Sequence, residues 1–235
     1  MSRSADLLDL LDAAAAALGE LVDDVVFVGG ATVALHLSDA AAPDVRPTRD
    51  VDVIVDVTSL VDYHMLSDRL RARGFREDTE DGAPICRWRA GELILDVMPT
   101  DEAILGFSSR WYREAMRTAV TMALPSGRPI RVVTPAMLLT TKLQAYLGRG
   151  GDDPYASHDL EDALTLIDGR EELPAEVRAC DSEVGGFVAT TLASIDGQHA
   201  LIRNLSRFLP PDEGSQARAT ILTGRLRDLM QMADT

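Results

Sequence analysis

The sequence predicts an α+β protein in which a head of strands and helices is followed by a C-terminal helical bundle. Between Val25 and Val133, short runs of apolar and β-branched residues alternate with helical stretches, and such runs are typical of buried strands. From Pro135 onward only helical periodicity remains. Strands mixed with helices, followed by helices alone, favour an α+β head joined to a helical domain. We therefore expect a head over residues 1–133 and a helical domain over residues 134–235.

Several segments of the head have the apolar, β-branched composition of strands. Two of them flank Ala90-Gly91 and predict a hairpin, because glycine supports the backbone that a tight turn requires. Another follows a turn at Ser126-Gly127. The expected strands are Val25–Gly30, Asp50–Val57, Ile85–Ala90, Glu92–Met98 and Arg131–Val133.

Helices are predicted in both parts of the chain. One of them is bounded by Ser59, a good N-terminal cap, and by Gly74, which can end a helix in the left-handed conformation. Pro210-Pro211 separates the last two helices. The expected helices are Ala5–Leu21, Ala31–Ser38, Ser59–Arg73, Ala136–Leu147, His158–Ile167, Glu183–Ile195, Gln198–Phe208 and Gln216–Met232.

Composition excludes several classes of protein. A chain of 235 residues that is 46% hydrophobic can bury a sizeable core, yet no apolar stretch approaches the roughly 20 residues that span a bilayer. The acidic, amphipathic N-terminal stretch is unlike a targeting peptide. Two cysteines, with no Cys/His cluster at zinc spacing, suggest reduced thiols. We expect a cytoplasmic protein without a membrane partner.

The charge balance bears on nucleic-acid binding. A net charge of −15 argues against a protein that coats nucleic acid, because neutralising phosphates requires a basic surface. Two groups of arginines could still form a local docking surface, or equally the solvated faces of helices. These groups are Arg69, Arg71, Arg73, Arg76, Arg87 and Arg89, and Arg110, Arg113 and Arg117.

The chemistry is concentrated between Val25 and Asp56. Gly29-Gly30 ends an apolar strand, and glycines at such a turn let backbone N–H groups approach a phosphate. Asp50 and Asp52 begin the next strand, where residues i and i+2 point to the same side about 7 Å apart. Two carboxylates so placed can flank a divalent metal ion. This layout is typical of a nucleotidyl-transfer site.

Two further residues stand out. Asp96 interrupts the apolar strand Glu92–Met98, where a carboxylate is costly unless it is paired or bound to metal. Lys142 is the single lysine beside 22 arginines. Arginine therefore serves wherever a positive charge suffices, and the remaining lysine could place a compact ammonium on a phosphate. Alternatively, Lys142 is a surface cation without a role.

Together these motifs resemble the DNA polymerase β-like nucleotidyltransferase superfamily. The form R-x-T-x-D-x-D, here Arg46, Thr48, Asp50 and Asp52, is similar to the AbiEii/AbiGii group, the nucleotidyltransferase toxins of type IV toxin–antitoxin systems. That group also has downstream motifs resembled here by the segment around Lys142, by Arg149 and by His158-Asp159-Leu-Glu-Asp162. His158 departs from the pattern, which usually has lysine before the aspartate.

The resemblance implies a nucleotidyltransferase-type mixed β-sheet with flanking helices, and an activity that depends on Mg²⁺ or Mn²⁺. By this resemblance Asp50, Asp52 and Asp96 would bind the metal, and Asp96 would also orient or deprotonate the attacking hydroxyl. Lys142 would neutralise the triphosphate, and Asp159 would position Lys142 or the nucleotide. The expected active cleft lies between the two domains. The expected nucleotide-binding residues are Gly29, Gly30, Thr32, Arg46, Thr48 and Lys142.

The expected reaction moves NMP from an NTP to a hydroxyl acceptor. The toxin group implies an RNA acceptor, such as a tRNA 3′ end, and a cognate antitoxin as partner. A small-molecule acceptor, as in the aminoglycoside nucleotidyltransferases, is the first alternative, and the acidic composition favours it mildly. A non-catalytic antitoxin or scaffold with the same fold is the second alternative. It would be expected to have lost at least one of the three carboxylates or the lysine.

Overall fold

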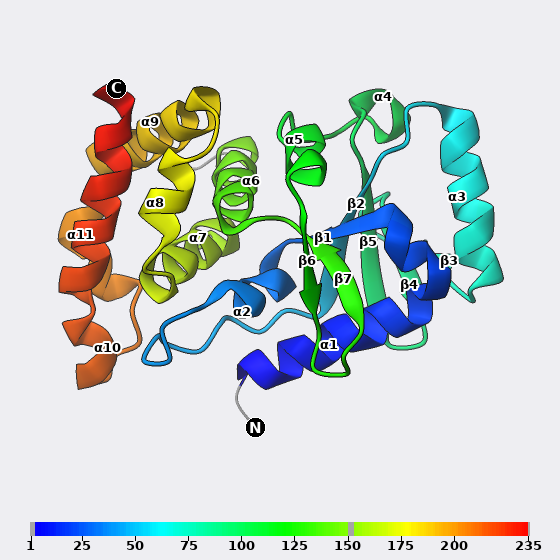
Figure 1. Ribbon diagram of the computed structural model, residues 1–235, viewed down its shortest axis with the longest axis horizontal. Coiled ribbons are helices and arrows are strands. Elements are labelled where there is room, and N and C mark those ends of the chain that lie inside the picture. Colours follow the sequence, from blue (N-terminus) through cyan, green and yellow to red (C-terminus); the bar gives the residue numbers. More distant parts are fainter. Residues whose placement is uncertain (1–2, 150–152, 235) are drawn as a thin grey trace. The chain divides into compact units, whose positions relative to one another are not determined.

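A computed structural model describes residues 3–149 and 153–234, so residues 1–2 and 235, at the ends of the two expected domains, lie outside the described residues. The chain forms two compact units. The sheet unit comprises Met1–Ala34 and Pro47–Thr134, and the helical unit comprises Leu35–Arg46 and Pro135–Thr235. Each unit is drawn in Figure 1 and is described here by itself.

The sheet unit is built on one mixed sheet of seven strands in the order β3-β4-β5-β2-β1-β7-β6. Strand β2 pairs antiparallel with β1 and parallel with β5, and β1 pairs parallel with β7. The outer pairs β3–β4, β4–β5 and β6–β7 are antiparallel. The strands are β1 (Val25–Val28), β2 (Asp50–Val55), β3 (Arg76–Glu77), β4 (Arg87–Ala90), β5 (Leu93–Pro99), β6 (Val120–Ala123) and β7 (Pro129–Val132).

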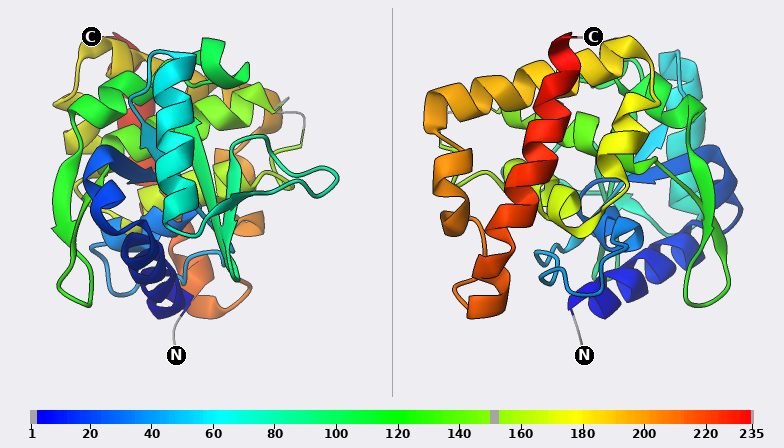
Figure 2. Two further views of the ribbon diagram at one scale, coloured as in Figure 1. Left: turned by 90° about the vertical axis from the view of Figure 1, so that its right-hand side faces the viewer. Right: turned by 60° about the vertical axis from the view of Figure 1, so that its left-hand side comes forward.

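Helices pack on this sheet through their apolar faces. Helix α1 (Arg3–Leu18) turns Leu7, Leu11 and Leu18 into the core and contacts β2 and β5. Helix α3 (Leu60–Ala72) stands in front of the strands in the left view of Figure 2. The remaining elements of this unit are the 3-10 turns Gly19–Asp24 and Gly30–Thr32 and the short helices α4 (Glu102–Leu105) and α5 (Tyr112–Arg117). The short helix α2 (Val33–His36) begins in the sheet unit and ends in the helical unit.

The structure confirms the predicted α+β class with a mixed sheet, flanking helices and C-terminal helices. The hairpin at Ala90-Gly91 forms as β4 and β5. Ser59 caps α3 by accepting a hydrogen bond from the Asp62 backbone N–H, and Gly74 follows with a positive φ. Strands β3 and β6 were not predicted. Both lie at the edges of the sheet and are largely exposed: β3 is two charged residues long, and the apolar residues of β6 do not alternate strictly with polar ones.

The helical unit contains α6 (Pro135–Gly148), α7 (His158–Gly169), α8 (Leu173–Arg178), α9 (Ser182–His199), α10 (Glu213–Ala217) and α11 (Ala219–Met230). Helix α8 was not predicted. The expected helix Gln198–Phe208 was wrong. Helix α9 instead continues to His199, Ala200 adopts the left-handed conformation, and Ile202–Arg207 forms a 3-10 turn. In the described residues, no helix is both long and apolar enough to cross a membrane.

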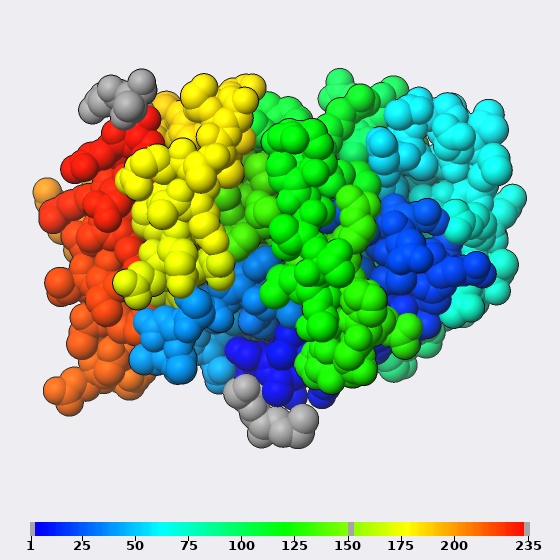
Figure 3. Space-filling view, viewed as in Figure 1, coloured from blue at the N-terminus to red at the C-terminus, as the bar shows by residue number. Residues whose placement is uncertain are grey.

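The segment Leu35–Arg46 belongs to the helical unit because long-range polar contacts fix it there. Arg218, which immediately precedes α11, bonds to Asp39 and to Asp168 on α7, at 2.7 Å each. The backbone N–H groups of Ser38 and Asp39 both donate to the carbonyl of Gly169. Figure 3 shows this segment, in sky blue, against the yellow surface of α8. A division at residue 133 alone therefore does not describe the two units.

Candidate functional site

The three predicted metal carboxylates lie on one face of the sheet. Asp50 and Asp52 are two residues apart on β2, so their side chains point to the same side. Parallel pairing of β2 with β5 sets Asp52 opposite Asp96, and residues directly opposite each other in a sheet share a face. The side chain of Asp96 is only 9% exposed, as its apolar neighbours led us to expect.

A guanidinium group joins two of these carboxylates. Arg87 on β4 faces Asp96 across the hairpin, and its Nε and Nη2 atoms donate to the two oxygens of Asp96 at 2.8 Å each. The same Nη2 atom lies 2.8 Å from Oδ2 of Asp50. The nearest oxygens of Asp50 and Asp96 are therefore separated by no more than twice that distance.

This contact has a clear electrostatic basis. Two carboxylates about 5 Å apart repel each other by about 3 kcal/mol at an effective dielectric constant of about 20. Arg87 offsets this repulsion, and its hydrogen bonds to Asp96, with the charges of Asp96 and Asp50, raise the pKa of Arg87 further above its usual range. Burial, together with the charges of Asp96 and Asp52, also raises the pKa of the neighbouring Cys86 thiol to about 12. The cluster thus retains a strongly negative field.

Gly29 gives Asp52 its place. Its backbone has φ 84° and ψ −170°, a region that is essentially restricted to glycine. A Cβ atom at Gly29 would lie 1.9 Å from Oδ2 of Asp52, so the carboxylate occupies the space that any side chain would need. The glycine at the end of β1 is therefore required both by the turn and by the carboxylate.

Two threonines predicted to bind nucleotide hold the turn and the carboxylate. The hydroxyl of Thr48 donates to Oδ1 of Asp50 and so fixes the orientation of that carboxylate. Thr32 is fully buried, and its hydroxyl donates to the carbonyl of Gly29 at 2.8 Å. Gly30, also buried, begins the 3-10 turn that follows Gly29.

A second charge cluster lies in the helical unit. Lys142 on α6 is 3.2 Å from Oδ1 of Asp159 and 2.7 Å from Oδ2 of Asp162, both on α7. All three side chains are at most 10% exposed. The lone lysine is therefore a buried cation between two carboxylates and not a surface charge.

Arginines complete this second cluster. Arg46 lies 3.4 Å from Asp162, and Arg149 forms an ion pair with Asp159. Arg46 belongs to the same unit as Lys142, because the division between the units falls between Arg46 and Pro47. A cavity of about 300 Å³ borders Asp159 and is lined by Tyr146, Arg149, Asp153, Ala156, Ser157, His158 and Asp159.

The fit to a metal ion can be judged from these contacts. Within residues 3–149 and 153–234, no three His, Cys, Asp or Glu side chains are grouped so that they could hold a metal as they stand. In the sheet unit, Arg87 holds Asp50 and Asp96 instead. The donor set still fits, because three carboxylates on one face are hard oxygen ligands of the kind that Mg²⁺ prefers, and two of them already share a cation.

Sequence reasoning missed Arg87 and gave Asp162 no role. Arg87 appeared only as one of six clustered arginines. The predicted hairpin could have revealed it, since pairing Ala90 with Leu93 also pairs Arg87 with Asp96. Asp162 was part of the quoted motif and lies one helical turn after Asp159, on the same side of α7.

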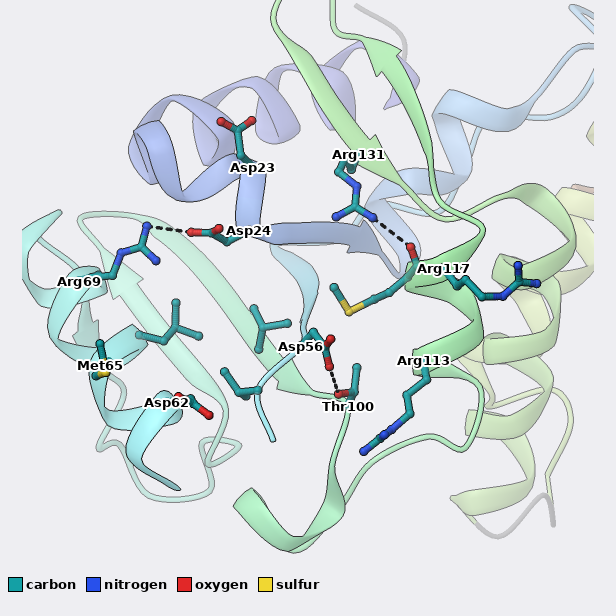
Figure 4. Close-up of a pocket in the computed structure, with 14 residues that line it drawn as sticks. Asp23, Asp24, Asp56, Asp62, Met65, Arg69, Thr100, Arg113, Arg117 and Arg131 are labelled. Carbon is teal, nitrogen blue, oxygen red and sulfur yellow. Dashed lines mark hydrogen bonds and ion pairs between the residues drawn. The ribbon is translucent and has the colours of Figure 1, made fainter. Parts of the chain in front are cut away.

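A larger cavity of about 740 Å³ lies elsewhere in the sheet unit (Figure 4). It adjoins Val55 and Asp56, about 20 Å along β2 from Asp50 at the usual rise per residue, and is therefore separate from the carboxylates. Figure 4 shows Arg69 beside Asp24 at one side and Arg113, Arg117 and Arg131 at the other.

Most of the arginines proposed as a docking surface have acidic partners. Ion pairs join Arg69 to Asp24, Arg71 to Asp68 and Glu77, Arg89 to Asp78 and Glu80, Arg113 to Asp101, and Arg117 to Glu114. The Asp78 side chain is only 2% exposed, but the other pairs are largely exposed, and exposed pairs contribute at most about 1 kcal/mol each. A nucleic acid could displace them, but the surface is not a bare basic patch.

Comparison with known proteins supports the fold. The chain resembles an antigenic nucleotidyltransferase-like protein from Paracoccidioides brasiliensis, with a TM-score of 0.50 and 19% sequence identity over 86% of this chain and 91% of that one. The fold is nucleotidyltransferase-like. The alignment with JHP933 from Helicobacter pylori covers 100% of this chain and 94% of JHP933 at 12% identity. Its TM-score of 0.47 is too low to establish a shared fold. No protein-family model and no curated protein matches the chain.

The substitution Gly29→Ala should destabilise the sheet unit and displace Asp52, because the new Cβ would overlap the carboxylate. Gly91→Ala is the matched control. Gly91 also has a positive φ, but nothing lies within 4 Å of its Cβ position, so only backbone strain of about 1 kcal/mol is expected. In urea unfolding, the loss in the free energy of unfolding should be at least twice as large for Gly29→Ala as for Gly91→Ala. Equal losses would mean that Asp52 does not depend on the glycine.

The substitution Lys142→Met should destabilise the helical unit by about 3 kcal/mol, since it leaves Asp159 and Asp162 buried with less compensation. Arg149→Met is the control, because the Arg149 side chain is 74% exposed and its loss should cost less than about 1 kcal/mol. Urea unfolding followed by circular dichroism measures both. If the two variants are equally stable, Lys142 has no structural role in the helical unit.

Proposed function

We propose that the chain is a metal-dependent nucleotidyltransferase that moves NMP from an NTP to a hydroxyl acceptor. One observation supports this most strongly. Asp50, Asp52 and Asp96 gather on one face of the sheet, beside a glycine turn that closes on Asp52, within a nucleotidyltransferase-like fold. A purely structural cluster would not need three carboxylates on one face, because their mutual repulsion is unfavourable.

In this proposal Asp50 and Asp52 hold a divalent ion, Mg²⁺ or Mn²⁺, with Asp96 as a further ligand. When bound, the ion would neutralise the triphosphate and favour in-line attack at the α-phosphorus. Thr48 orients Asp50 through its hydroxyl. Gly29 and Gly30 would offer backbone N–H groups to the phosphates, since no side chain at Gly29 obstructs their approach.

Asp96 remains in the proposal as a further metal ligand and as the group that would orient or deprotonate the attacking hydroxyl. As the structure stands, both of its oxygens accept hydrogen bonds from Arg87. Asp96 can therefore bind the ion only if it gives up at least one of these contacts.

Lys142 and Asp159 remain in the proposal as nucleotide-contacting and positioning groups. The ammonium of Lys142 already has two carboxylate partners, so it must give up one of them to bind a phosphate. A compact ammonium can exchange one of them for a phosphate oxygen, whereas a planar guanidinium cannot do so in the same space. Lys142→Arg should therefore lose most of the activity although the charge is kept.

The acceptor and biological role are proposed from the R-x-T-x-D-x-D motif. The proposed acceptor is an RNA, such as a tRNA 3′ end. The proposed role is that of a toxin with a cognate antitoxin. The net charge of −15 favours a second candidate, a cationic small molecule of the aminoglycoside kind. Incubating the protein with each α-labelled NTP and either total tRNA or an aminoglycoside panel separates the two. Label on neither acceptor, at any metal concentration, would favour the non-catalytic scaffold.

The decisive variant is Asp52→Asn. It removes a proposed metal ligand at nearly constant shape, so nucleotidyl transfer should fall by at least 100-fold, while the free energy of unfolding without metal should be unchanged or higher. Asp56→Asn is the matched control, since Asp56 follows the same strand at its other end, where it accepts a hydrogen bond from Thr100. Full activity in Asp52→Asn would remove the carboxylates from the reaction.

A further inference from the structure

Arg87 occupies the position of a cation shared by two acidic side chains. Its Nη2 atom lies 2.8 Å from Oδ2 of Asp50 and 2.8 Å from Oδ2 of Asp96, while Nε takes the other oxygen of Asp96. The Arg87 side chain is 19% exposed, so water screens these contacts only partly. Arg87 thus contacts both oxygens of Asp96 and one oxygen of Asp50.

The same oxygens are the ligands that the proposed metal site requires. An ion that bound Oδ2 of Asp50 and Oδ2 of Asp96 in place of Arg87 would take over the role that the Nη2 atom has between these two oxygens. Two cations cannot share this space, because their cores would overlap and their charges would repel each other.

We propose that Arg87 and the divalent ion compete for Asp50 and Asp96, so that Arg87 sets the metal affinity of the site. This inference rests on the proposed function and adds to it a residue that controls loading of the site. Without metal, Arg87 holds the carboxylates together and offsets their repulsion. Metal binding at Asp50 and Asp96 breaks the contacts of Arg87, and the free energy lost there is subtracted from the binding of the ion.

The proposal has an unusual consequence, because removing a positive residue should both destabilise the protein without metal and strengthen metal binding. Any loss of a cation strengthens Mn²⁺ binding slightly through long-range electrostatics. The control must therefore remove one arginine charge nearby without freeing the carboxylates of the site. Arg89 meets this requirement, since it lies two residues along the same strand and pairs with Asp78 and Glu80.

The test is titration of Mn²⁺ into the full chain by isothermal calorimetry, without nucleotide, for wild type, Arg87→Met and Arg89→Met. Methionine keeps the length of the apolar stem and removes the donors. We expect Arg87→Met to bind Mn²⁺ at least tenfold more tightly than wild type, and Arg89→Met to change the affinity by less than threefold. Thermal unfolding should show a lower midpoint for Arg87→Met without metal and a larger rise with Mn²⁺.

Other results would overturn the inference. Wild-type or weaker Mn²⁺ binding by Arg87→Met would show that Arg87 does not compete, and the metal site of the proposed function would survive. Mn²⁺ binding by none of the three proteins would remove that metal site together with the inference. If Arg87→Met does not fold, Arg87→Lys replaces it. A lysine ammonium lacks the two-nitrogen fork with which Arg87 binds both oxygens of Asp96, so its hold on the carboxylates is weaker. Mn²⁺ binding at least threefold tighter than wild type is therefore expected, and unchanged binding overturns the proposal.

Discussion

The strand pairing of the sheet unit gathers carboxylates on one face of adjacent strands, where Arg87 joins two of them. Parallel pairing of β2 with β5 sets Asp52 opposite Asp96, and antiparallel pairing of β4 with β5 sets Arg87 opposite the same residue. A slip of one residue in either register would move the shifted strand's charges to the other face of the sheet. The contacts of Arg87 with Asp50 and Asp96 can therefore form only when both strand pairs have the observed register.

The helical unit also contains cations that each pair with two carboxylates. Lys142 is buried between Asp159 and Asp162, and Arg218 is buried between Asp39 and Asp168. Each cation joins segments that are distant in sequence. Buried pairs of this kind contribute little net stability compared with apolar packing, but breaking one partner is costly, so they favour a unique arrangement of the segments they join.

Much of the fold could be predicted because its signals are local. The β-branched runs at Val25 and Asp50, the cap at Ser59 and the turn at Gly91 each depend on residues close in sequence. The attachment of Leu35–Arg46 could not be predicted, because it depends on Arg218, 179 residues from Asp39. The end of α9 was missed because Ala200, a strong helix former, adopts the left-handed conformation there.

The three carboxylates of the candidate site were singled out from the sequence, but the arginine that pairs with two of them was not. Asp50, Asp52 and Asp96 could be found from a spacing and an interrupted apolar strand, whereas the partner of Asp96 follows only from the register of the hairpin. Anomalous diffraction from crystals soaked with Mn²⁺ and an unreactive NTP analogue tests the central claim most directly. We predict a peak within about 2.5 Å of oxygens of Asp50 and Asp52, with the triphosphate on the same ion. A nucleotide bound elsewhere, with no peak at these carboxylates, would contradict the account.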